Sequence, residues 1–75
     1  MPFDGARLRE LRHRRALTLR ELGALSGVSY DQIHGIETGK HQPRPSTVRK
    51  LADALGIDPD AFFSDWEADE GKAAA

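Results

Sequence analysis

The chain has 75 residues, which is enough for one small domain with a modest hydrophobic core. It contains no cysteine, so disulfides and thiolate metal sites are excluded, and its three histidines do not match a zinc-ligand spacing. No apolar run approaches the length of a membrane span, about 18 residues. The N-terminal residues have no apolar signal-peptide core either, so a cytoplasmic protein is expected.

The net charge of −1 hides an asymmetry along the chain. Residues 1–50 contain ten basic and five acidic side chains, a net of +5. Residues 51–75 contain one basic and seven acidic side chains, a net of −6. A polyanionic partner would therefore meet the first part of the chain and avoid the second. The alternative is that two solvated faces merely differ in charge.

The spacing of apolar residues predicts helices throughout, because no segment alternates apolar and polar residues long enough to form a strand. A first helix is expected over residues 5–16. A second begins at Thr18, since Glu21 three residues later completes a capping-box pattern, and it ends at Gly27. The residues expected to face inward from these two helices are Leu8, Leu11, Leu22 and Leu25.

Ser29 followed by Gln32 repeats the capping pattern and predicts the start of a third helix. Ile33 and Ile36 form its inward pair, and Gly39, which suits a left-handed conformation, ends it. Its other side is polar without being rich in good helix formers, which indicates that these side chains contact a partner. The residues expected on this solvent side are Tyr30, Asp31, Gln32, His34 and Gly35.

Two nearby prolines make residues 40–45 a loop. Ser46 is expected to cap a fourth helix, and Asp58 to cap a short fifth helix with Pro59 at its first position. The inward residues of the fourth helix are Val48, Leu51, Ala52 and Leu55. The fifth helix carries Phe62, Phe63 and Trp66.

The link between the second and third helices is very short. A tight turn of this kind that contains glycine sets two helices at roughly 90–120° to each other. Gly23, four residues before Gly27, leaves room for the third helix to pass close by. These features predict an all-α, five-helix domain over residues 1–66. Residues 67–75 are expected to form a flexible tail, first acidic and then of small residues.

The segment "LTLRELGALSGVSYDQIHGIETGK" resembles the helix-turn-helix of the Cro/repressor-type family, also described as Xre-like or lambda-repressor-like. The segment "PSTVRKLADALGIDPDAFF" resembles the last two helices of that family. The resemblance covers roughly residues 6–63, with the motif at about 18–37. It implies a compact five-helix DNA-binding domain, usually dimeric, whose second motif helix lies in the major groove while the first crosses the backbone.

The resemblance, carried over by position, also implies roles for individual residues. The expected base-reading residues are Ser29, Tyr30, Asp31, Gln32 and His34. The expected phosphate-contacting residues are Thr18, Arg20, Thr38, Lys40 and Arg44. Gln32 has the chemistry to form two hydrogen bonds with adenine, and Asp31 can accept one from cytosine. The family also pairs an arginine of its first helix with a glutamate that ends the third, which here are Arg12 and Glu37.

Two positions depart from the family pattern. Leu19 stands where many members have a glutamine that contacts the DNA backbone, and Gly35 stands where a longer polar reader is common. Glycine weakens a helix by ~1 kcal/mol relative to alanine. We therefore expect weaker direct readout, which shape readout or a strong dimer would offset.

Several of these residues keep a second interpretation. Tyr30 is either a reader or a surface aromatic packed on the second helix, and His34 is either a reader or a solvated histidine. The arginines of "RLRELRHRR" either attract phosphates or form a solvated face. The spacing of Asp31, His34 and Glu37 by three does not predict a metal site, because side chains at this spacing drift around the helix surface.

These features favour a sequence-specific regulator that binds double-stranded DNA, most simply a dimeric repressor or autoregulator of a palindromic operator. Phe62, Phe63 and Trp66 are expected to supply a dimer surface, because three large aromatics in five residues are hard to bury in so small a domain. The alternative is an antitoxin or adaptor that binds a protein partner through this aromatic surface. No catalytic constellation supports an enzyme, and no cofactor, metal or membrane partner is expected.

Overall fold

The computed structural model describes residues 3–63 of the chain. Within this range there are four α-helices and one turn of 3-10 helix, η1, and the only β-type pairing is an isolated bridge. The elements are α1 (Gly5–Arg14), α2 (Leu19–Ser26), α3 (Tyr30–Glu37), α4 (Pro45–Leu55) and η1 (Pro59–Phe62). The predicted all-α class is confirmed. The expected fifth helix is only the single turn η1 in the described part of the chain.

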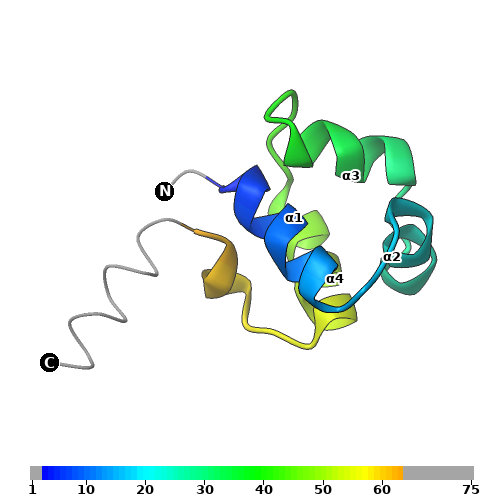
Figure 1. Ribbon diagram of the computed structural model, residues 1–75. Coiled ribbons are helices and arrows are strands. Elements are labelled where there is room, and N and C mark those ends of the chain that lie inside the picture. The colour runs from blue at the N-terminus through cyan, green and yellow to red at the C-terminus, as the bar shows by residue number, and fades with distance from the viewer. Residues whose placement is uncertain (1–2, 64–75) are drawn as a thin grey trace, which may run out of the picture.

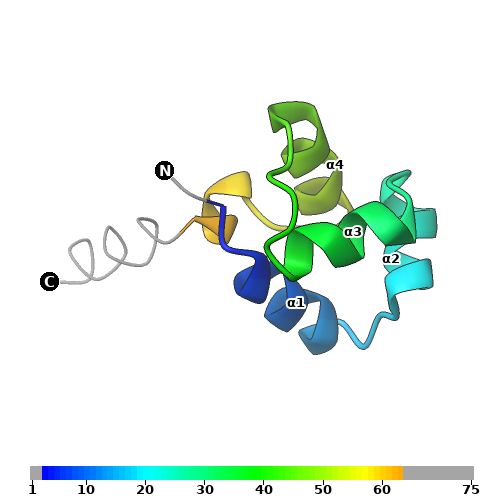
Figure 2. The ribbon, with the colours of Figure 1, turned by 90° about the horizontal axis from the view of Figure 1, so that it is seen from above.

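The four helices pack around a common centre, and α3 lies at the outer edge of the domain (Figure 1). Helix α2 contacts both α3 and α4, while α1 contacts α3 and η1. In the view from above, α3 lies nearest the viewer, with α1, α2 and α4 around it (Figure 2). Helix α3 therefore has one side packed against the domain and the opposite side open.

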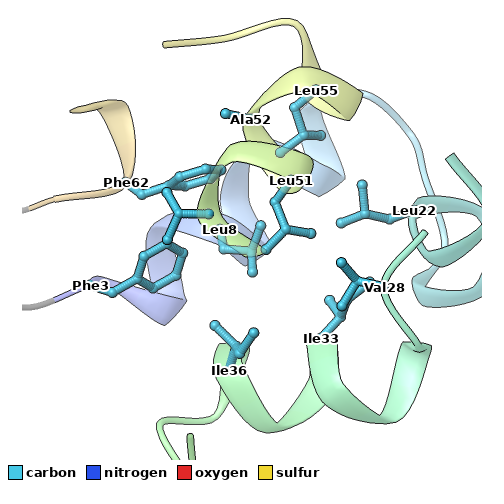
Figure 3. Packing of buried hydrophobic residues seen from close by; sticks show 11 residues of the cluster. Phe3, Leu8, Leu22, Val28, Ile33, Ile36, Leu51, Ala52, Leu55 and Phe62 are labelled. Atoms are coloured by element: carbon cyan, nitrogen blue, oxygen red, sulfur yellow. The ribbon is translucent and has the colours of Figure 1, made fainter. Parts of the chain in front are cut away.

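A single hydrophobic core lies between the helices. Each α-helix contributes at least one fully buried side chain, among them Leu8 from α1, Leu22 from α2 and Ile33 from α3. Figure 3 shows these side chains pointing toward one another, with Leu51 of α4 between them. The complete set of buried hydrophobic residues is Phe3, Leu8, Leu22, Val28, Ile33, Ile36, Val48, Leu51, Ala52, Leu55 and Phe62. The predicted inward residues of α4 are all among them.

Local capping explains where α2 begins and ends. The Thr18 side chain accepts a hydrogen bond from the Glu21 amide (3.0 Å), and the Glu21 carboxylate accepts one from the Thr18 amide (2.8 Å). This reciprocal pair satisfies two amides that the first turn leaves without partners. At the other end Gly27 adopts the left-handed conformation, with φ of 78°. Both predicted boundaries of α2 are confirmed.

The start of α4 differs from the prediction. Ser46 does not cap the helix; instead the helix begins at Pro45, and Arg44 occupies the cap position with no side-chain hydrogen bond. Proline favours the first helical position because its missing N–H has no partner there, and its ring pushes the preceding residue into an extended conformation. Arg44 is extended accordingly, with ψ of 157°. Asp58 does cap η1, accepting from the Asp60 amide at 3.0 Å.

The inward side of α2 also differs from the prediction. Leu25 was expected to face the core, but 61% of it is exposed. The inward side is formed instead by Leu19, Leu22, Gly23 and Ser26, which follow the spacing of one helix face. Leu19 is half-buried and packs against the core. A leucine at this position, where many members of the family have a glutamine, therefore contributes to the packing of the core.

The two ends of the described chain are joined. The Asp4 amide donates to the Phe62 carbonyl (2.9 Å), and Phe3 forms the isolated bridge with Phe63. Phe62 is completely buried, and its ring centroid lies 5.0 Å from that of Phe3. The predicted dimer surface is therefore wrong at Phe62, because a ring with no exposed area cannot contact a second copy. Trp66 and the predicted tail over residues 67–75 lie outside the described residues.

Candidate nucleic-acid interface

At the turn between α2 and α3 the backbones of the two helices approach so closely that only a small residue fits between them. A Cβ atom at Gly23 would stand 2.9 Å from the Val28 carbonyl oxygen and 3.5 Å from the Tyr30 amide nitrogen. A backbone oxygen cannot give way cheaply, so glycine is required at this crossing. The Val28 amide donates to the Ser26 hydroxyl at 3.2 Å, which helps to close the turn. The expected close approach of the two helices at Gly23 is present.

Helix α3 has a buried inner side and a polar outer side. Ile33 and Ile36 insert into the core, and both are labelled at the lower edge of the core in Figure 3. The outer side carries Asp31, Gln32 and His34, all exposed. This arrangement presents hydrogen-bonding groups to a partner while the aliphatic pair holds the helix to the domain.

Two of the predicted base-reading residues also have local roles. The Ser29 hydroxyl accepts a hydrogen bond from the Gln32 amide at 3.3 Å and so caps α3. Its hydroxyl proton remains a donor toward a partner. The ring of Tyr30 lies under the Arg20 guanidinium, 4.7 Å from carbon to ring centroid, which is a cation–π contact between α3 and α2. Tyr30 is nevertheless 41% exposed, so its packing on α2 leaves part of the ring accessible.

The predicted phosphate-contacting residues lie at the start of α2, at the end of α3 and in the loop that follows it. Thr18 lies at the start of α2, and Lys40 and Arg44 follow the C-terminus of α3; all three are exposed. Thr38 is also exposed, but its hydroxyl donates to the carbonyls of His34 (2.9 Å) and Gly35 (3.3 Å). Thr38 therefore helps to close the end of α3, and its proton is engaged within the chain.

A buried ion pair fixes the position of α3. The Arg12 guanidinium meets the Glu37 carboxylate through two hydrogen bonds, Nε to Oε2 at 2.7 Å and Nη2 to Oε1 at 3.0 Å. Only 9% of the Arg12 side chain and 3% of the Glu37 side chain are exposed. The third donor, Nη1, reaches the Leu17 carbonyl at 2.8 Å. One side chain of α1 thus joins the link before α2 to the end of α3.

The link before α2 contains a strained residue. Ala16 has φ of 55°, a left-handed conformation that costs a residue with a Cβ atom roughly 1–2 kcal/mol. The Leu17 amide donates to the Arg12 carbonyl at 3.2 Å, and the Leu17 carbonyl accepts from the Arg12 side chain. Arg12 therefore forms hydrogen bonds with both the amide and the carbonyl of Leu17, the residue that follows Ala16.

Two residues of the site had no signal in the spacing of the sequence. Gly35 was expected to face solvent, but it is buried, because the His41 ring covers it. The second is Gly5, at the start of α1. A Cβ atom there would collide with the Ile36 carbonyl oxygen and stand 3.0 Å from that of Glu37. The packing of α1 against α3 reveals the requirement at Gly5, and the return of the loop after α3 reveals the one at Gly35.

Among residues 3–63, no group of three or more histidine, cysteine, aspartate or glutamate side chains could hold a metal ion. In the same range, no helix is long and apolar enough to cross a membrane.

The capped α2, the left-handed glycine turn and the two-sided α3 define a helix-turn-helix domain. Residues 5–62 match the family model described as "Helix-turn-helix domain", and the chain belongs to this family. The predicted family resemblance is thereby confirmed.

Similar proteins carry regulatory names. The chain is 50% identical over 58 residues to the HTH-type transcriptional repressor RghR of Bacillus subtilis, covering 76% of this chain and 43% of RghR. It is 38% identical over 63 residues to the HTH-type transcriptional regulator PuuR of Escherichia coli, covering 84% of this chain and 34% of PuuR. The chain thus spans less than half the length of these curated relatives. They are named as regulators of transcription, not as enzymes.

A solved structure matches the fold over most of its length. The restriction-modification controller protein C.AhdI from Aeromonas hydrophila has a TM-score of 0.77 and 39% sequence identity. The match covers 79% of this chain and 89% of that chain. A domain of this size therefore makes up nearly all of the C.AhdI structure.

Proposed function

We propose that this chain binds double-stranded DNA and regulates transcription, and that α3 reads the sequence in the major groove. The polar, exposed outer side of α3 carries this proposal. This side has a fixed position in the domain, because the aliphatic inner side of α3 and the Arg12–Glu37 pair hold the helix to the core. The names of RghR, PuuR and C.AhdI support the same function.

The charges around α3 fit a duplex. Arg20, Lys40 and Arg44 are exposed on its flanks, where cations meet phosphates. Glu37 would repel phosphates, but its carboxylate is engaged by Arg12 and almost completely buried. The acidic third of the chain begins after residue 50, at the other end of the sequence. Phosphate contacts would set the orientation of α3, and base contacts from Asp31 and Gln32 would set its preference.

The regulator is proposed to act in the cytoplasm as a homodimeric repressor or autoregulator. A helix of eight residues, such as α3, reaches only a few base pairs. Two copies of it placed about 34 Å apart read an inverted repeat, and occupying that site would block a promoter. The repressor role follows the name of RghR, which is a repressor.

Selection from a randomised duplex library tests this function. At ~0.15 M salt we expect the retained sequences to share an inverted repeat with half-sites about one helical turn apart. Binding to the enriched duplex should weaken steeply as salt increases, because phosphate contacts release counterions. A retained pool without a common sequence would contradict specific recognition by α3. A protein that retained no duplex at all would favour the adaptor alternative.

The dimer surface is proposed to lie around Phe63. This half-buried ring packs edge-on against Phe3, with centroids 5.7 Å apart, beside a mostly apolar hollow between the start of α4 and η1. The hollow is lined by Phe3, Gln42, Pro43, Pro45, Val48, Arg49, Pro59 and Phe63. We propose that a second copy of the chain covers it, because reading a palindrome requires two copies.

Replacing Phe63 by Ser is expected to weaken self-association at least ~10-fold in sedimentation equilibrium, about 1.4 kcal/mol of binding energy. The matched control is Leu25→Ser, which removes an exposed apolar side chain from α2 and should leave association unchanged. Both variants should still melt cooperatively. If Leu25→Ser separates the copies and Phe63→Ser does not, the surface is on α2 instead. A wild-type chain that stays monomeric would contradict the dimer.

A further inference from the structure

The burial of Gly35 is unexpected from its place on α3. It follows Asp31 by four residues and Gln32 by three, so it lies one turn further along the same outer side of the helix. A residue without a side chain at such a place would normally leave bare backbone exposed. Gly35 is buried nevertheless, and the nearest side chain over it is that of His41.

The His41 ring occupies the space that a side chain at position 35 would fill. A Cβ atom built on Gly35 would collide with His41 Cδ2, and would stand 2.8 Å from Nε2 and 3.3 Å from Cγ. His41 itself is exposed, so its ring covers the helix with one face or edge and meets solvent with the rest. An imidazole, which carries one hydrogen-bond donor and one acceptor when neutral, therefore stands beside the predicted readers.

The backbone holds His41 in this place. After α3 ends, Gly39 takes the left-handed conformation, with φ of 82°, and turns the chain back over the helix. The amides of Lys40 (2.8 Å) and His41 (3.2 Å) then both donate to the Gly35 carbonyl. Because its own amide is tied to the residue that it covers, the backbone of His41 is held beside Gly35 before any DNA arrives.

We propose that His41 is a base-reading residue, which presents its imidazole from the outer side of α3 in place of the side chain that Gly35 lacks. This inference rests on the proposed DNA-binding function. It accounts for the glycine at a position where the resemblance led us to expect a polar reader. The reader is supplied by the following loop instead of by the helix.

The simpler role for His41 is to shield the backbone at Gly35 from water. The two roles differ in what an added methyl group does. In Gly35→Ala the new Cβ atom must displace the ring, since both cannot occupy the same space. If the ring only shields the backbone, the methyl group replaces it. If the ring reads a base, displacing it removes the contact.

The experiment compares the wild type with His41→Ala, Gly35→Ala and the double variant on the duplex selected by the wild type and on its single-base variants. We expect His41→Ala to bind the selected duplex ~10-fold more weakly and to lose discrimination at one position of each half-site. Gly35→Ala should show the same loss, and the double variant no further loss, because the changes remove one contact. The matched control is His13→Ala, an exposed histidine on α1 that should bind as the wild type does.

Three results would overturn the role of His41. The first is wild-type affinity in His41→Ala. The second is recovery of affinity in the double variant, which would assign the ring to shielding. The third is an equal loss on every duplex, which would assign it to a phosphate. Thermal melts of each variant separate these effects from unfolding. A wild-type protein that selects no sequence would instead overturn the proposed function itself.

Discussion

Replacing Glu37 by Ala is expected to destabilise the domain by about 3–5 kcal/mol, because it leaves the buried Arg12 guanidinium without its counter-charge. Both side chains are almost fully excluded from water, so the charge of Arg12 cannot be solvated in place. A domain of this size has a small total stability. We expect the melting temperature to fall by at least ~12 °C, measured by circular dichroism.

The chain contains a matched control for this experiment. Glu10 pairs with Arg14 at 3.2 Å and with Arg7 at 3.6 Å, but 47% of its side chain is exposed, against 3% for Glu37. Glu10→Ala should change the stability by less than ~1 kcal/mol, since exposed pairs gain little over their solvated state. Equal losses in Glu37→Ala and Glu10→Ala would contradict a special role for the buried pair.

A double variant separates the cost of an unpaired charge from the value of the pair. Arg12→Met with Glu37→Leu removes both charges, and apolar replacement of a buried pair is often neutral or stabilising. Here Arg12 also donates a hydrogen bond to the Leu17 carbonyl, which would lose this donor in the double variant. We therefore expect the double variant to recover most, but not all, of the stability lost in Glu37→Ala. A double variant that is less stable than Glu37→Ala would contradict this explanation.

Replacing Gln32 by Ala is expected to relax the base preference at one position of each half-site, with a loss of about 1–3 kcal/mol on the selected duplex. Gln32 is exposed on the outer side of α3, and its amide can form two hydrogen bonds with adenine. Its side chain is outside the core, so the melting temperature should change little. Binding to single-base variants of the duplex, measured by fluorescence anisotropy, gives the preference.

Lys40→Ala is the contrasting variant. Lys40 lies past the end of α3, where a cation can meet a phosphate of any sequence. We expect weaker binding to all duplexes by a similar factor, and a decrease of about one in the slope of log K against log salt. If Gln32→Ala and Lys40→Ala weakened every duplex equally, the division into base-reading and phosphate-contacting residues would be wrong.

The sequence by itself determined the features that depend on neighbours along the chain. The capping box of Thr18 and Glu21 and the left-handed Gly27 bound α2 as predicted, because their hydrogen bonds and backbone conformations are local. The aliphatic pair Ile33 and Ile36 likewise identified the inner side of α3. The ion pair of Arg12 and Glu37 was expected only from the family resemblance, since 25 residues separate the partners.

Only the tertiary structure decided the features that depend on how elements meet. Leu25 had the spacing of a core residue, yet the way α2 docks turns Leu19 inward and leaves Leu25 in water. Phe62 and Phe63 are adjacent in sequence, but the turn at η1 buries one and leaves the other at the edge of a hollow. His41 reaches Gly35 because the chain folds back at Gly39. Side-chain periodicity does not describe contacts between elements, and one of these contacts, that of His41 with Gly35, completes the outer side of α3.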